Sequence, residues 1–173
     1  MTTAETLITV GKALERVNDE TKQMIYDLSC QLSELDIIRS FNQEALDMFT
    51  VVGAIIKKLG KESEYKIGGY KNIFDVAIKT NAKLPLDKFT LIILEFAPEI
   101  YEEQEDCFLN MSIPDKNVNV GNEFAIIRSE MFKNIWRHSN HEDRELIKQK
   151  VIPLTTYAHA FFYKSLTNLS KKN

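Results

Sequence analysis

The sequence predicts an all-α protein, a bundle of about six helices with a long N-terminal helix and a buried C-terminal helix. Apolar residues recur along most of the chain with the 3.6-residue period of a helix. The chain has only 6 Gly and 4 Pro, too few for the many tight turns of a β-sandwich. Its 173 residues are enough to bury a core, and we assign residues 1–173 to a single α-helical domain.

The buried C-terminal helix is predicted over residues 151–169. Its apolar residues cover nearly the whole circumference of a helix, so other helices have to enclose it. The segment is too short and too often interrupted by polar residues to cross a bilayer. One stripe of the predicted helix consists of Val151, Leu154, Ala158, Phe161, Ser165, Leu166 and Leu169.

The long N-terminal helix is predicted over residues 3–39, with residues 1–40 forming an amphipathic element that projects from the bundle. Ten positions follow one another at alternating spacings of three and four, which is the spacing of a heptad seam. Two interpretations stay open: the helix packs on its own domain, or it pairs with a partner protein or a second copy. The residues predicted to bind such a partner are Leu7, Val10, Leu14, Val17, Met24 and Leu28.

A second helix is predicted from about residue 43 to residue 59. Ser40 and Asn42 are candidate N-caps, and Gly60 is expected to end the helix. The polar stretch 61–70 contains two consecutive glycines and predicts an exposed loop. A short helix is expected at 71–80.

The nearly continuous apolar run at 86–96 fits either a helix or a buried strand. Helix is favoured, because Pro85 is a good first helical residue and Asp87 suits a first turn. Another turn is expected to begin at Pro98, followed by the acidic cluster at 102–106.

The remaining third of the chain is predicted to hold a loop and then more helix. The loop is expected at 110–122 and the next helix at about 122–138. A break at 139–140 precedes helix from residue 141 onward. Pro153 then either opens a further helix or kinks one long helix.

Composition argues against several classes of function. The net charge is −3 and the pI is about 5.7, so a nucleic-acid-binding surface is not expected. No apolar run is long enough for a membrane-spanning helix, and the N-terminus does not resemble a signal peptide. The two cysteines, Cys30 and Cys107, indicate a reducing compartment such as the cytoplasm.

Residues capable of chemistry are few. His138 and His141, near Glu142 and Asp143, together with the acidic cluster at 102–106, could contribute ligands to a metal site. The alternative function is therefore a metal-binding protein or metal-dependent enzyme. A polar turn and a solvated charge run explain the same residues without a metal. We expect no enzyme activity and no cofactor.

Cys107 and His159 could also take part in chemistry, but both are expected to be structural. The carboxylates next to Cys107 should raise the pKa of its thiol and make it a poor nucleophile. His159 lies in an apolar helix and is expected to be a hydrogen-bonded core histidine.

The stretch 131–158 resembles a pattern found in small, uncharacterised α-helical proteins of large DNA viruses of protists. In that pattern a helix ending in Phe-Lys-x-x-Trp leads through a polar turn to a helix that docks on it. Pro153 departs from the pattern. The resemblance implies a structural or protein–protein interaction module, associated with the virion or capsid, and transfers no catalytic residue. The matching residues are Phe132, Lys133, Trp136, Arg144, Ile147, Leu154 and Ala158.

Overall fold

The computed structural model describes residues 3–65, 67–107 and 129–172, and within these ranges it contains helices and turns and no β-strand. The predicted all-α class is therefore confirmed. The elements in chain order are α1 Thr3–Glu15, α2 Asp19–Gln31, α3 Glu34–Lys58, α4 Glu62–Tyr65, α5 Ile67–Thr80, α6 Leu84–Ile93, the 3-10 helix η1 Leu94–Phe96, α7 Ala97–Tyr101, α9 Ser129–His138 and α10 His141–Lys172.

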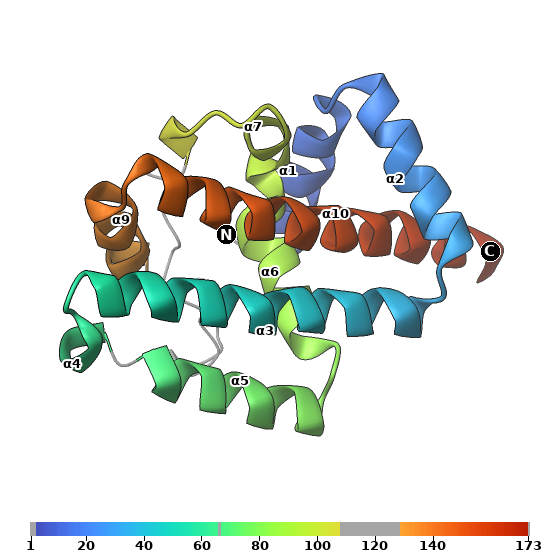
Figure 1. The fold of residues 1–173 in the computed structure, drawn as a ribbon. Coiled ribbons are helices and arrows are strands. Elements are labelled where there is room, and N and C mark those ends of the chain that lie inside the picture. The colour runs from blue at the N-terminus through green and yellow to red at the C-terminus, as the bar shows by residue number, and fades with distance from the viewer. Residues whose placement is uncertain (1–2, 66, 108–128, 173) are drawn as a thin grey trace.

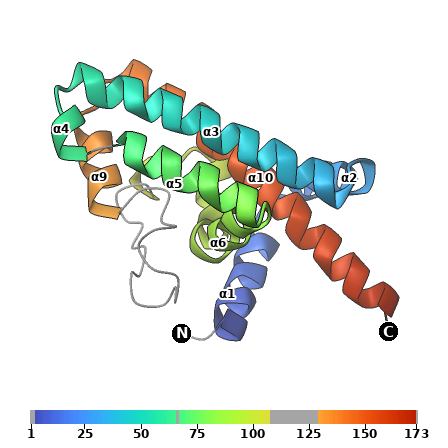
Figure 2. The same ribbon diagram turned by 90° about the horizontal axis from the view of Figure 1, so that it is seen from below.

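The two longest helices, α3 and α10, run side by side in opposite directions and form the centre of the bundle (Figure 1). α2 packs along the C-terminal half of α10, and α5 packs on α3. α1 contacts α6, η1 and α7 on another side of α10. The C-terminal turns of α10 extend past the other helices (Figure 2).

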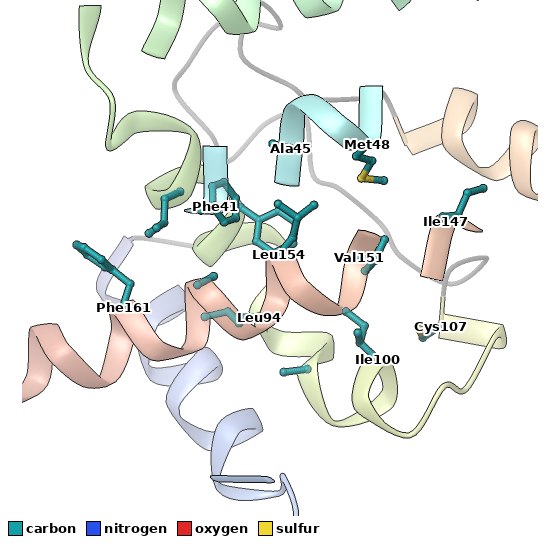
Figure 3. Packing of buried hydrophobic residues seen from close by; sticks show 14 of the residues in the cluster. Phe41, Ala45, Met48, Leu94, Ile100, Cys107, Ile147, Val151, Leu154 and Phe161 are labelled. Carbon is teal, nitrogen blue, oxygen red and sulfur yellow. The ribbon is translucent and has the colours of Figure 1, made fainter. Parts of the chain in front are cut away.

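One hydrophobic core joins these helices, and α10 supplies a central row of it. Val151, Leu154, Ala158 and Phe161 are all buried, as the sequence predicted. Leu154 lies beside Phe41 of α3 in the interior (Figure 3). The enclosure does not extend to the end of α10, because the side chain of Leu166 is 47% exposed.

The prediction of one long N-terminal helix was wrong: residues 3–39 form α1, α2 and the start of α3. The side chain of Asn18 accepts a hydrogen bond from the Thr21 backbone N–H and caps α2. Ser33 caps α3 by accepting from the N–H of Asp36 at 3.1 Å. These caps stabilise new helix starts where the apolar spacing alone would allow a continuous helix.

Asn18→Ala should change the free energy of unfolding in opposite directions for a helix that starts at α2 and for one continuous N-terminal helix. Loss of an N-cap should lower the free energy of unfolding by about 1 kcal/mol. In the interior of a continuous helix the same change should raise it by a few tenths of a kcal/mol, because Ala has the higher helix propensity. Urea unfolding followed by circular dichroism measures the sign, and an increase in stability would contradict the break before α2.

Two further boundaries differ from prediction. α3 begins at Glu34, so Ser40 and Asn42 lie inside it rather than at its N-terminus. The Asn42 amide instead donates to the carbonyl of Ala82 at 2.9 Å. The predicted end is confirmed, since Gly60 follows α3 with a left-handed φ of 69°.

The stretch 61–70 is not a simple loop, because α4 and the first turn of α5 occupy most of it. Gly68 and Gly69 lie within α5, where both are exposed. Glycine costs about 1 kcal/mol in a helix interior. We attribute the helix to packing, because Tyr70 and the buried Phe74 and Ala77 place α5 against the core.

The run 86–96 is helical, as favoured, and forms most of α6 together with η1. Pro85 lies in the first turn of α6. Pro153 does not open a further helix. It lies inside α10, which is one long helix. The predicted loop at 110–122 and the start of the helix predicted at 122–138 lie outside the described residues.

Candidate functional site

The six residues predicted to bind a partner do not share one environment. Val10, Leu14 and Val17 are 0%, 3% and 4% exposed and belong to the chain's own core. Their assignment to a partner interface is corrected, because α1, which carries Val10 and Leu14, packs against α6, η1 and α7, and Val17 is buried in the turn that follows α1. Leu28 is partly buried against the same core. Only Leu7 and Met24 of the six are largely accessible, at 39% and 66% exposed.

Two exposed apolar residues near these positions were missed from the sequence. Ile8 is 59% exposed on α1, and Tyr26 is 47% exposed on α2. Both fall outside the heptad positions, on helix faces where an amphipathic pattern calls for polar residues. An apolar residue on a face expected to be polar was the sequence signal that could have identified them. We call Leu7, Ile8, Met24 and Tyr26 the α1–α2 apolar set.

The acidic cluster at 102–106 is organised around a lysine. The side chain of Lys148, on α10, is 9% exposed, and its Nζ lies 3.3 Å from an Oε1 of Glu105 and 3.6 Å from that of Glu103. Glu145, one turn earlier on α10, is a third partner, and its hydrogen bond raises the pKa of Lys148. These carboxylates thus neutralise an ammonium group and tie the segment after α7 to α10.

The metal alternative required His138 and His141 to join the acidic cluster. Both histidines are exposed, one at the end of α9 and one at the start of α10. The nearby Asp143 is buried and accepts two hydrogen bonds of 2.9 Å from Lys58 of α3. In the part of the chain that the structure describes, no three His, Cys, Asp or Glu side chains come together to hold a metal ion.

The turn between α9 and α10 has the structural role expected for it. Asn140 accepts a hydrogen bond from the Asp143 N–H at 2.8 Å and caps α10. Arg144 donates to the carbonyl of Trp136 at 3.0 Å, with its guanidinium 5.2 Å from the centre of the indole. This turn therefore fixes the angle at which α10 leaves α9.

Cys107 does not have the surroundings of a nucleophile. Cys107 is buried, and burial together with Glu99 and Asp106 raises the pKa of its thiol to about 12. The rise in this pKa that its acidic neighbours predicted is confirmed, although burial is the larger cause. Cys30 is an exposed residue of α2.

His159 is the core histidine that the sequence predicted. It is 0% exposed, and its Nδ1 lies 3.0 Å from the hydroxyl oxygen of Tyr101 on α7. Burial and, secondarily, the ammonium of Lys22 lower the pKa of the imidazole to about 4. The ring is therefore neutral at neutral pH and packs as part of the interior.

Comparison with known proteins places the chain beside a viral protein. Over 162 residues it is 51% identical to "Uncharacterized protein R465" of Acanthamoeba polyphaga mimivirus, and the match covers 94% of this chain and 90% of that protein. No protein-family model matches the chain. No solved structure matches it significantly. None of the described helices has an apolar stretch sufficient to cross a membrane.

Proposed function

This chain belongs to the family of the mimivirus protein R465, and we propose that it is a structural or protein–protein interaction module of the virus rather than an enzyme. The partner would be a protein, bound through α1 and α2. The single observation that supports this most is the α1–α2 apolar set, four large side chains between 39% and 66% exposed on consecutive helices.

The exposure of this set favours binding for an energetic reason. Removing apolar surface from water contributes roughly 25 cal/mol per Å². Aromatic residues and methionine are enriched at protein interfaces, and Tyr26 and Met24 are of these types. Single exposed apolar residues are common on monomers, so the argument depends on four of them occurring on two consecutive helices, between Leu7 and Tyr26 in sequence.

The internal contacts of the charged groups also support a noncatalytic role. The Lys58–Asp143 ion pair joins α3 to α10, and the Lys148–Glu105 pair joins α10 to the segment after α7. Arg16 pairs with Glu99 at 3.4 Å, and Lys150 pairs with Glu44 at 3.4 Å. These groups are paired with one another between separate segments of the bundle.

Membership in a viral family supports a place for the chain in the virion, in association with the capsid, or in the assembly of the particle in the cytoplasm of the infected cell. Such roles depend on binding surfaces, and a small helical module supplies one without a cofactor. The negative net charge of −3 favours a protein over a nucleic acid as partner.

The test is affinity purification of a tagged chain from cells infected with the source virus, with each partner quantified by mass spectrometry. Ile8→Glu/Met24→Glu places two charges in the α1–α2 apolar set and should reduce partner recovery by about tenfold or more, equivalent to about 1.4 kcal/mol of binding. Both side chains are exposed, so the variant should keep the helical circular dichroism of the parent.

Val76→Glu is the matched control, because Val76 is 64% exposed but lies on α5. We expect this variant to recover the same partners in the same amounts as the parent. Equal recovery by the parent and by Ile8→Glu/Met24→Glu would contradict a binding role for α1 and α2.

A further inference from the structure

A row of aromatic rings lies where α7 and α2 pack on the C-terminal half of α10. The imidazole of His159 lies between Tyr101 of α7, with ring centres 5.9 Å apart, and Tyr163 of α10, at 4.5 Å. Tyr163 in turn meets the edge of Tyr26 on α2 at 6.4 Å. This row, Tyr101–His159–Tyr163–Tyr26, links α7, α10 and α2, and the His159 imidazole lies within it.

The surroundings of His159 suit a neutral ring and oppose a charged one. Its Nε2 is buried with no hydrogen-bond partner among the described residues. A neutral imidazole can place its acceptor nitrogen there, whereas an imidazolium would carry an N–H donor at that position without an acceptor. An unsatisfied buried donor and a buried charge are both unfavourable.

The neighbouring groups do not offset this charge. The titratable and charged groups described around the ring are Tyr101 of α7, Tyr163 of α10 and Lys22 of α2. Burial raises the pKa of both phenols, so neither supplies an anion. Lys22 is a like charge to an imidazolium. Glu99, also on α7, pairs with Arg16 through Oε1, its Oε2 is buried without a hydrogen-bond partner among the described residues, and its charge has no effect on the pKa of His159.

We propose that His159 is an acid-sensitive latch: protonation of its imidazole releases α2 and α7 from the C-terminal half of α10, while the other end of the bundle, around Trp136, stays packed. The released contacts would include the Tyr163–Tyr26 pair and the 2.9 Å hydrogen bond from Lys164 to the carbonyl of Ser29. Trp136 is 1% exposed on α9, and α9 lies at the opposite end of α10 from α2 (Figure 1).

The direction of the pH effect follows from linkage. The pKa of His159 in the folded chain is about 4, below its usual value of 6.5, so the open form binds the proton more tightly than the closed form. The closed form is fully favoured above pH 6.5. The opening equilibrium should rise by up to about tenfold for each pH unit below 6.5, until the pH reaches the folded pKa.

Hydrogen exchange of the full-length chain at pH 7 and pH 5, corrected for intrinsic exchange rates, tests the latch. Protection in α2 and in the peptide containing α7 should fall by about tenfold to thirtyfold at pH 5, while protection around Trp136 should change little. In His159→Asn, whose amide can meet Tyr101 in place of Nδ1 but does not titrate, the acid response should disappear.

The control is His138→Asn/His141→Asn, which removes the other two histidines, both exposed, and should keep the parent's acid response. The latch is overturned if protection in α2 and α7 is the same at both pH values, if it falls equally around Trp136, if His159→Asn still responds, or if the control does not.

Should His159→Asn fail to fold, NMR of the unmodified chain decides the question. The His159 Cε1–H resonance is expected to keep its neutral position at pH 5.5 in every molecule whose α2 and α7 amide signals are native. A shift to the imidazolium position while those amide signals stay unchanged would overturn the latch, because the ring would then ionise without opening.

Discussion

Replacing Phe161 with Ala is expected to lower the free energy of unfolding by about 3–5 kcal/mol, a large part of the total of about 5–15 kcal/mol for a domain. The side chain is 6% exposed on the row of α10 that faces the core. The ammonium of Lys83 lies 5.1 Å from the centre of its ring, so truncation also removes a cation–π contact. Urea unfolding followed by circular dichroism measures the change.

Leu166→Ala is the matched control on the same helix, because its side chain is 47% exposed. We expect it to cost less than about 1 kcal/mol, since surface substitutions have small effects. If Phe161→Ala and Leu166→Ala unfold at the same urea concentration as the parent, the C-terminal half of α10 is not enclosed as described.

Phe41→Ala is the second large effect, again about 3–5 kcal/mol. Phe41 is 0% exposed on α3, and its ring meets the edge of Phe89 of α6 at 5.2 Å between centres. The change opens a cavity between α3, α6 and α10 that the surrounding helices can fill only in part. Leu35→Ala, on α3 but 51% exposed, should cost less than about 1 kcal/mol.

A double-mutant cycle with Phe41→Leu and Phe89→Leu separates the ring contact from general packing. We expect a coupling energy of about 0.5–1.5 kcal/mol for the edge-to-face pair. Strictly additive effects of the two substitutions would show that the rings do not interact across α3 and α6.

The helical class and much of the core could be predicted because both depend on local spacing. The stripe at Val151, Leu154, Ala158 and Phe161 is buried as its period indicated. Pro85 correctly distinguished a helix from a strand in the apolar run after it, because its geometry suits a first helical turn.

The helix breaks near the N-terminus were misjudged because the heptad spacing continues across them. Asn18 and Ser33 each begin a helix, and each is followed by acidic residues in the first turn, which is the usual signature of an N-terminus. Weighing those capping signals above the apolar period would have predicted three helices in place of one.

The partner-binding residues could be predicted only in part. A heptad seam shows that Val10 and Met24 are apolar and periodic, but not which of them the chain buries itself. That choice depends on contacts between α1 and the segment from α6 to α7, about 80 residues away in sequence. The position of Lys148 at the centre of the acidic cluster could not be predicted either, because 43 residues separate it from Glu105 in sequence.

Hydrogen exchange on the chain alone and in the complex recovered from infected cells is the most direct measurement of the proposed binding role. We expect added protection at neutral pH to concentrate in residues 3–31, which include α1, α2 and the α1–α2 apolar set, with α5 and α9 unchanged. Added protection confined to other helices, or an exchange pattern identical with and without the partner, would contradict the assignment of α1 and α2 as the interaction element.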